Sequence, residues 1–321
     1  MLVQQTLPLE MTVIGALNWD INLFVKQIPK PGEEVVVTRI DRVPGGKGGN
    51  VAVAAARILG SSKTALISSL GSDETGKKQI SILREEGVET SGIREIDRVE
   101  SGQAYITVDE YGNDTIMTHF GANALLKEEQ IMEPQIQTML GKSKLILAID
   151  PPKQVAKKIL SEGKRLRKIL VWHPGVLARF GIKEWSEELK DLQYLILNQH
   201  EAIVFTGAKT LESALAKLNE EAPGTRIVVT LGKNGAAYHA GGKMFAVQNV
   251  DVEKLGGKVV NTAGCGDAFV GAFGAYKTLG KTDEESLQYA NMAGALKATR
   301  PETRGSPTRR ELEEAYRRYS R

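Results

Sequence analysis

Six short apolar runs, separated by longer amphipathic stretches, constrain the fold of this 321-residue sequence more than any other feature. Such runs predict strands that are buried on both faces, and the stretches between them predict helices. We therefore expect an α/β fold: a central, mainly parallel sheet with helices on both faces, whose ligands bind beyond the carboxyl ends of the strands. Strands are predicted at 11–15, 63–68, 144–148, 168–172, 194–197 and 226–230. Helices are predicted at 50–59, 75–86, 127–140, 154–163 and 211–220.

Two segments, 35–43 and 103–119, interrupt this alternation because each predicts strands without an intervening helix. The second contains a turn signal, so the two segments predict a small antiparallel sheet that projects from the main domain. Such a sheet is either a lid over a binding site or a decorative edge, with strands expected from about 19–44 and 101–119. No repeat or Pro-, Gly- or Ser-rich linker divides the sequence, which predicts a single domain over 1–321.

Composition argues against several classes of protein. Hydrophobic residues make up 41% and charged residues 25% of the sequence, as in ordinary soluble globular proteins. The single cysteine argues against a disulfide framework and predicts a reducing, cytoplasmic location. No apolar run approaches the ~20 residues of a membrane span. The first ten residues lack signal-peptide features and predict a short disordered or strand-leading extension.

The net charge of +3 arises from a basic C-terminal segment that starts at Lys297. A basic helix there could contact nucleic acid, but Glu311, Glu313 and Glu314 interrupt the basic residues, which favours a solvated helix face. We therefore expect a small-molecule partner rather than nucleic acid or a membrane.

The segment 261–269 carries the strongest chemical signal. Its small residues lead into a predicted helix at 267–279, whose first N–H groups can approach an anion closely and whose dipole favours negative charge. An anion cradle beside the Asp267 carboxylate is what phosphoryl transfer to an alcohol requires. Cys265 lies within this cradle, either as a small residue that admits the phosphate or as a thiol of low pKa.

A glycine-rich turn at 45–50 precedes a predicted helix. It matches neither the phosphate-binding loop nor the dinucleotide fingerprint, and it presents Lys47 and Asn50, whose donors and acceptors suit hydroxyl groups. A purely structural turn is the alternative. Asn18 and Asp20 follow the first strand and can face one small ligand together, or form a local Asx turn.

Two further strand ends carry polar residues. Asn198 and Glu201 follow the strand at 194–197; they could bind hydrated Mg²⁺, cap the next helix, or do both. The segment 230–235 follows another strand and either wraps nucleotide phosphates or turns the chain. The histidines do not have the spacing of a zinc site.

Together these motifs resemble the ribokinase-like (pfkB-type) carbohydrate kinases, most closely the ribokinase branch. The resemblance runs from Met11 to the C-terminal helix and rests on two signatures, 45–50 and 262–269, with the strand-end motif at 198–201 between them. The segment 120–123, Phe-Gly-Ala-Asn, is most similar to the ribokinase branch. The resemblance implies a central, mainly parallel sheet with helices on both sides and a β lid.

The resemblance also implies roles for individual residues. Asp267 is expected to be the catalytic base. The transferring phosphoryl group is expected to bind the backbone N–H groups of Ala263, Gly264, Cys265 and Gly266. The sugar is expected to bind Asn18, Asp20, Gly46, Lys47, Asn50 and Asp150. The nucleotide is expected to bind Asn198, Glu201, Thr230, Gly232, Gly235 and Asn291, with Glu201 holding Mg²⁺ through water.

The reaction that the resemblance implies is ATP-dependent phosphorylation of a hydroxyl of ribose or a similar small sugar, with ATP and Mg²⁺ as cofactors. Asp150 favours an unphosphorylated sugar, because its repulsion of a phosphate at ~4 Å is of order 4 kcal/mol. A nucleoside or ribose 1-phosphate as substrate, ADP as donor, and a catalytically silent sugar sensor stay open as alternatives. An exposed lid face could also form a homodimer interface.

One position departs from the family pattern. Asn261 stands where the ribokinase branch has an aspartate that supports a potassium site. The segment 300–307 is also an imperfect match to the region that completes this site. Dependence on a monovalent cation is therefore open.

Overall fold

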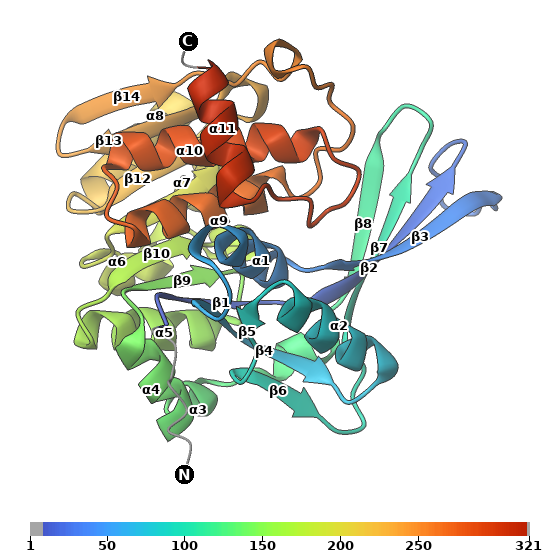
Figure 1. Ribbon diagram of the computed structural model, residues 1–321, viewed down its shortest axis with the longest axis horizontal. Coiled ribbons are helices and arrows are strands. Elements are labelled where there is room, and N and C mark those ends of the chain that lie inside the picture. Colours follow the sequence, from blue (N-terminus) through green and yellow to red (C-terminus); the bar gives the residue numbers. More distant parts are fainter. Residues whose placement is uncertain (1–8, 320–321) are drawn as a thin grey trace.

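The computed structural model describes residues 9–319, so the predicted N-terminal extension lies outside the described residues apart from its last two. Figure 1 shows a central sheet with helices on both sides and a smaller sheet that projects from one end. Within residues 9–319, no helix is long and apolar enough to cross a membrane.

The central sheet contains all six predicted strands, with shifts of one to three residues at some ends. They pair in parallel in the order β12-β11-β10-β9-β1-β4. Their bounds are β1 Met11–Gly15, β4 Thr64–Gly71, β9 Leu145–Ile149, β10 Ile169–His173, β11 Tyr194–Asn198 and β12 Arg226–Thr230. The edges are completed by β5 Val88–Glu89, β6 Ile93–Ile96, β13 Ala236–Ala240 and β14 Lys243–Val247.

Two apolar cores cover the two faces of this sheet, because side chains alternate between faces along a strand. Val13 and Leu147 lie in one core, and their neighbours Ile14 and Ala148 lie in the other. The first core includes residues of α1 Lys47–Leu59, α2 Glu74–Glu85, α9 Cys265–Thr278, α10 Asp283–Ala298 and α11 Arg309–Tyr319. The second includes residues of α3 Glu128–Ile131, α4 Pro134–Lys142, α5 Lys153–Arg165, α6 Ser186–Leu189, α7 Gln199–Thr206 and α8 Leu211–Glu221.

The helix predicted at 127–140 is wrong in one respect, since it is broken between α3 and α4. Glu133 has non-helical backbone angles and Pro134 begins α4. Proline disfavours helical angles at the preceding residue and has no N–H to donate, which explains the break.

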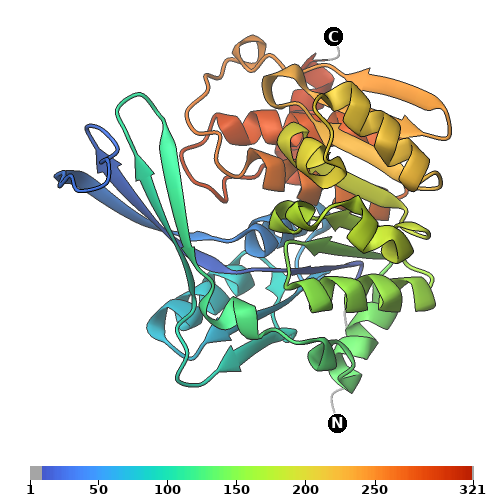
Figure 2. The ribbon, with the colours of Figure 1, turned by 180° about the vertical axis from the view of Figure 1, so that it is seen from behind.

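The projecting sheet is the predicted lid, and its strand order is β3-β2-β7-β8. Its strands are β2 Asn18–Val25, β3 Val37–Gly45, β7 Gly102–Val108 and β8 Asp114–His119. Figures 1 and 2 show from opposite sides how these strands extend away from the helices. The predicted antiparallel arrangement is wrong for the central pair, because β2 and β7 run parallel. The strand β2, which follows β1 after two residues, was not among the individually predicted strands.

Candidate active site

Asp267 lies in the first turn of α9, where Gly264 ends the preceding loop with a φ of 80°. A Cβ atom on Gly264 would lie 2.3 Å from the carbonyl oxygen of Thr303, so both the backbone angle and the close approach require glycine. Gly266, in contrast, has open space beyond its Cα. The start of α9 is therefore packed on one side and open on the other.

Two of the four amides predicted to bind the phosphoryl group already have an acceptor in this structure. The Ala263 N–H donates to Asn261 Oδ1 at 2.9 Å, and the Cys265 N–H donates to the Thr262 carbonyl at 3.2 Å. Among residues 9–319, the N–H groups of Gly264, Gly266 and Asp267 have no acceptor. In this part of the chain, the amides that are open to an anion therefore lie closer to Asp267 than predicted.

The Asp267 carboxylate is held by the sequence-distant Asn50 of α1. Asn50 Nδ2 donates to Asp267 Oδ2 at 2.8 Å, while Asn50 Oδ1 accepts from Arg304 Nε at 3.0 Å. Burial raises the pKa of Asp267, and the Asn50 hydrogen bond and the charges of Lys47 and His173 oppose that rise. A fixed carboxylate with a raised pKa is a suitable acceptor for a hydroxyl proton.

Lys47 and Asp150, both predicted to bind the sugar, also bind each other. Lys47 Nζ donates to Asp150 Oδ2 at 3.0 Å, and the Val176 N–H donates to Asp150 Oδ1 at 3.0 Å. Burial lowers the pKa of Lys47, but Asp150 outweighs it and the net pKa is raised. Asp150 has a φ of 52°, which is uncommon for a residue other than glycine. Lys47 and Asp150 therefore form a fixed ion pair at the carboxyl end of β9.

Asn18 and Asp20 project from the first lid strand, β2, against the glycine turn. A Cβ atom on Gly46 would lie 2.4 Å from the Asn18 N atom, and one on Gly45 would lie 2.1 Å from the Asp20 carboxyl group. Asn123, within the 3₁₀ turn Gly121–Leu125, donates from Nδ2 to Asn18 Oδ1 at 2.9 Å. The predicted close-approach turn is confirmed: it packs against the Asp20 carboxyl group and the Asn18 backbone.

Asp20 has an unusual charge state. Burial raises its pKa to about 7; Arg304 opposes this rise and Asp267 adds to it. Its carboxyl group is therefore partly protonated near neutral pH.

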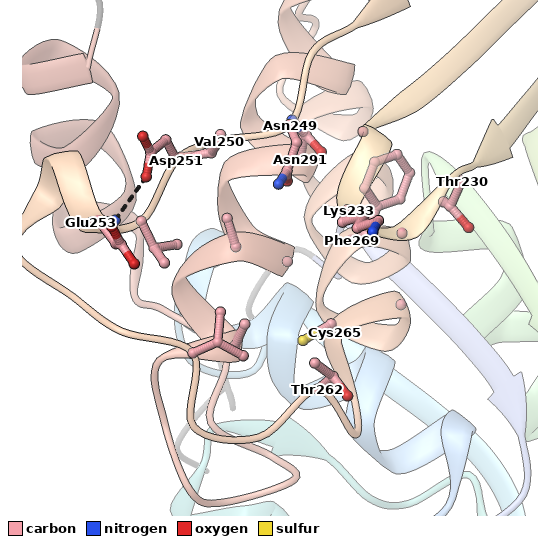
Figure 3. A pocket seen from close by; sticks show the side chains of 18 residues that line it. Thr230, Lys233, Asn249, Val250, Asp251, Glu253, Thr262, Cys265, Phe269 and Asn291 are labelled. Carbon is pink, nitrogen blue, oxygen red and sulfur yellow. Dashed lines mark hydrogen bonds between the residues drawn. The ribbon is translucent and has the colours of Figure 1, made fainter. Parts of the chain in front are cut away.

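A pocket of about 620 Å³ opens beside the start of α9. It is lined by six of the predicted residues: Thr230, Gly232, Gly235, Cys265, Gly266 and Asn291. Figure 3 shows Thr262 and Cys265 at one end of this pocket and Asn249 and Asn291 at the other. Asn291 donates from Nδ2 to the Gln248 carbonyl at 2.6 Å, which ties α10 to the segment that forms the far wall. The pocket thus extends from the start of α9 to Asn249 and Asn291.

Asn198 and Glu201 form the predicted capping box at the start of α7 and do not line this pocket. The Asn198 N–H donates to Glu201 Oε2 at 2.9 Å, and the Glu201 N–H donates to Asn198 Oδ1 at 2.8 Å. His173 Nε2 lies 3.5 Å from Glu201 Oε2. Among the described residues, no three His, Cys, Asp or Glu side chains are placed to hold a metal ion directly. A magnesium ion here would be held mainly by water and phosphate oxygens, a mode that Mg²⁺ favours.

Several residues of the site were not among the predicted ones. Arg304 and Asn123 position predicted residues, and the segment 249–253 lines the pocket. Arg304 falls in the segment 300–307 that matches the family pattern imperfectly, so no motif could assign it. Asn123 ends the 120–123 segment, which was the only available signal.

A carboxylate beside free helix-start amides, between a pocket of about 620 Å³ and a polar cluster at the base of a β lid, defines a phosphotransferase that acts on a small alcohol. Residues 9–309 match the pfkB family carbohydrate kinase profile, and the chain belongs to this family. It is therefore a carbohydrate kinase, and the predicted fold class and reaction class are confirmed.

Three comparisons illustrate the relationship. The sequence is 30% identical over 310 residues to the ribokinase of Bacillus subtilis (strain 168), covering 94% of this chain and 97% of that protein. It is 28% identical over 294 residues to the ATP-dependent ribose-1-phosphate kinase of Halopiger xanaduensis, covering 92% and 93% of the two chains. The crystal structure of ribokinase from Thermotoga maritima matches with a TM-score of 0.83 at 28% identity, covering 96% and 99%.

Proposed function

We propose that this protein transfers the γ-phosphoryl group of ATP to the primary hydroxyl of ribose or a similar small sugar. The observation that carries the proposal is the Asp267 carboxylate, fixed by Asn50 beside the free amides at the start of α9. The polar cluster of Asn18, Asp20 and the Lys47–Asp150 pair lies under the lid and offers both donors and acceptors to sugar hydroxyls. The similarity to a ribokinase supports ribose as substrate.

In the proposed reaction, Asp267 accepts the hydroxyl proton as the sugar oxygen attacks phosphorus. The N–H groups of Gly264, Gly266 and Asp267 stabilise negative charge on the transferred group, with the α9 dipole acting in the same direction. The lid excludes water, which limits hydrolysis of the nucleotide. Most of the acceleration comes from positioning and electrostatics, as is usual for phosphoryl transfer.

The proposed nucleotide site is the pocket that runs from Gly266 to Asn291. Thr230, Gly232 and Gly235 lie on its wall and are proposed to contact the phosphates, while the far end takes the base. Mg²⁺, when bound, neutralises phosphate charge. Glu201 is proposed to hold it through water, because one of its oxygens is already occupied by the Asn198 N–H.

A sugar phosphate is the second candidate substrate, and Arg304 is the observation that favours it. Its Nη1 atom is buried without a hydrogen-bond partner, although the guanidinium contacts Asn50 and Gly45. Such a group would be satisfied by an anionic oxygen of a substrate. The relative that acts on ribose 1-phosphate is consistent with this alternative.

A substrate panel tests the proposal. ADP formation from ATP and Mg²⁺ is measured with ribose, ribose 1-phosphate, fructose, adenosine and cytidine, and the donor series is repeated with ADP, following AMP formation. We expect the highest kcat/KM for ribose with ATP. A higher kcat/KM for ribose 1-phosphate would establish the protein as a sugar-phosphate kinase. Sugar binding without ADP formation would indicate a catalytically silent sugar sensor.

We also propose that residues 1–321 act as one domain in the cytoplasm, and that two copies associate through the lid. The outer lid face carries Ile40, Tyr105 and Met117, which are exposed by 44%, 36% and 58%. Strand register places Tyr105 opposite Met117 on neighbouring strands. Light scattering on the protein and on a Met117→Glu variant tests this interface; a monomeric parent protein would contradict it.

A further inference from the structure

Lys297 is a buried charged group that the proposed reaction does not use. It lies near the end of α10 with none of its surface exposed to solvent. Its Nζ donates to the Asn261 carbonyl at 2.9 Å and to the Arg300 carbonyl at 3.3 Å. Within residues 9–319 it forms no ion pair, so its partners are neutral oxygens. Burial lowers the pKa of this ammonium group.

The two carbonyl groups belong to the two loops that form the back of the anion-binding amides. Asn261 lies in the loop that leads to Gly264 and the first turn of α9, and Arg300 lies in the loop that carries Thr303 and Arg304. The loops also contact each other directly, since Asn261 Nδ2 donates to the Pro301 carbonyl at 2.7 Å. Gly264 packs against the Thr303 carbonyl. Lys297 therefore links the two loops, and their contact determines the position of the start of α9.

We propose that the Lys297 ammonium is a built-in cation that positions the anion-binding amides and makes phosphoryl transfer independent of an added monovalent cation. This inference rests on the proposed function. Backbone carbonyl oxygens that converge on one point are the ligands that a potassium ion takes in proteins. Here the oxygens of Asn261 and Arg300 converge on a protein ammonium, and the Asn261 amide group takes the Pro301 oxygen.

The charge matters as well as the geometry. An uncharged side chain of the same length would remove the donor of the Arg300 carbonyl and leave the Asn261 carbonyl with only the weak donor Cys265 Sγ at 3.9 Å, so the loops would separate or admit water. It would also remove a positive charge from behind the amides that receive the phosphoryl group. Lys297 is thus a positioning residue that does not touch the substrate.

The test compares the protein with Lys297→Met, Lys297→Arg and Lys297→Ala in buffers that contain tetramethylammonium, potassium or ammonium as the only monovalent cation. The kcat of the parent protein should differ by less than twofold among the three buffers. Lys297→Met should lose about 10²-fold in kcat, as when one oxyanion donor is removed, with the sugar KM little changed. Lys297→Arg should retain part of the activity.

Lys297→Ala supplies the decisive measurement, because it leaves space for an ion. Adding potassium, ammonium or methylammonium should raise the kcat of Lys297→Ala at least tenfold. Tetramethylammonium, which is too large for the space, should leave it unchanged. Lys277→Met is the matched control, since Lys277 is a nearly buried lysine on α9 that pairs with Asp283 away from the loops. That variant should show no rescue by any cation.

Three results would overturn the proposal: parent activity that rises tenfold or more with potassium, a folded Lys297→Met variant with parent-like kcat, or no rescue of Lys297→Ala by any cation. Should Lys297→Ala not fold, Lys297→Met and the salt series decide. Calorimetric ADP affinity, expected to fall in Lys297→Met and not in Lys277→Met, tests the loop junction without turnover. A parent protein that phosphorylates no sugar would refute the proposed function and leave this binding test standing.

Discussion

Asp267 and Asp20 both have raised pKa values, but their neighbours give the two carboxyl groups different tasks. Asp267 receives a hydrogen bond from Asn50 and lies beside free amides, which supports its proposed role as the base. Asp20 lies on the lid strand against Gly45, near the Arg304 charge, and is the carboxyl group that we propose to contact the sugar. Two acids in one site can thus separate proton transfer from substrate recognition.

Replacing Asp267 by asparagine should lower kcat by about 10²–10⁴, with a modest change in the sugar KM, because the variant keeps the shape and loses the proton acceptor. Steady-state kinetics at saturating ATP measure this effect. The thermal stability of the variant provides the control for folding. Near-normal turnover would exclude Asp267 as the base.

Sugar affinity should rise with pH through about 7, the raised pKa of Asp20. Below this pH the carboxyl group is protonated, and above it the carboxylate accepts a stronger, charge-assisted hydrogen bond from a sugar hydroxyl. Calorimetric titration without nucleotide between pH 5.5 and 8.5 should show about a tenfold gain in affinity.

The Asp20→Asn variant should bind weakly at every pH. Asp267→Asn is the control and should keep a pH dependence with its midpoint at lower pH than in the parent protein, because the Asp267 charge contributes to the raised pKa of Asp20. An unchanged pH dependence in Asp20→Asn would assign the titration to another group.

At the scale of elements, the strands of the central sheet follow directly from sequence, because a run buried on both faces carries its pattern locally. The break at Pro134 was not predicted, although the properties of proline are enough to predict it. The parallel pairing of β2 with β7 could not be predicted from the sequence, since it joins residues that are more than 80 positions apart. The amides left free depend on a local side-chain acceptor, Asn261 Oδ1, that no motif records.

The start of α9 offers a matched pair of glycine substitutions. Gly264→Ala should lower both the melting temperature and kcat, because Gly264 has a positive φ and a Cβ atom there meets the Thr303 carbonyl. Gly266→Ala should leave the melting temperature unchanged and lower kcat, because its Cβ atom meets no protein atom and projects into the proposed phosphate space.

Thermal melts and steady-state kinetics on both variants make the comparison. Gly141→Ala, which also meets no atom but lies on α4, is the control and should change neither quantity. A Gly266→Ala variant with full activity would remove this glycine from the anion-binding site.

At the scale of the whole molecule, the site is assembled from parts of the chain that only the fold brings together. Asn50 contacts Asp267 across 217 positions and Arg304 across 254. Sequence motifs located most members of the cluster, because each motif ends a strand or starts a helix at the same edge of the sheet. The roles of Arg304 and Lys297 could not be predicted from the sequence, since both residues act through contacts between loops.

The lid shares residues with the sugar cluster, which leads to a prediction about its motion. Asp20 lies on β2, and the Gly45–Gly46 turn ends β3, so a bound sugar should hold both strands. Amide hydrogen exchange of β2, β3, β7 and β8 should slow by about tenfold or more when the sugar binds, because opening must then break the sugar contacts. The edge hairpin β13–β14 is the internal control, and its exchange should stay the same. Equal protection of lid and hairpin, or no change in either, would show that the sugar binds without engaging the lid.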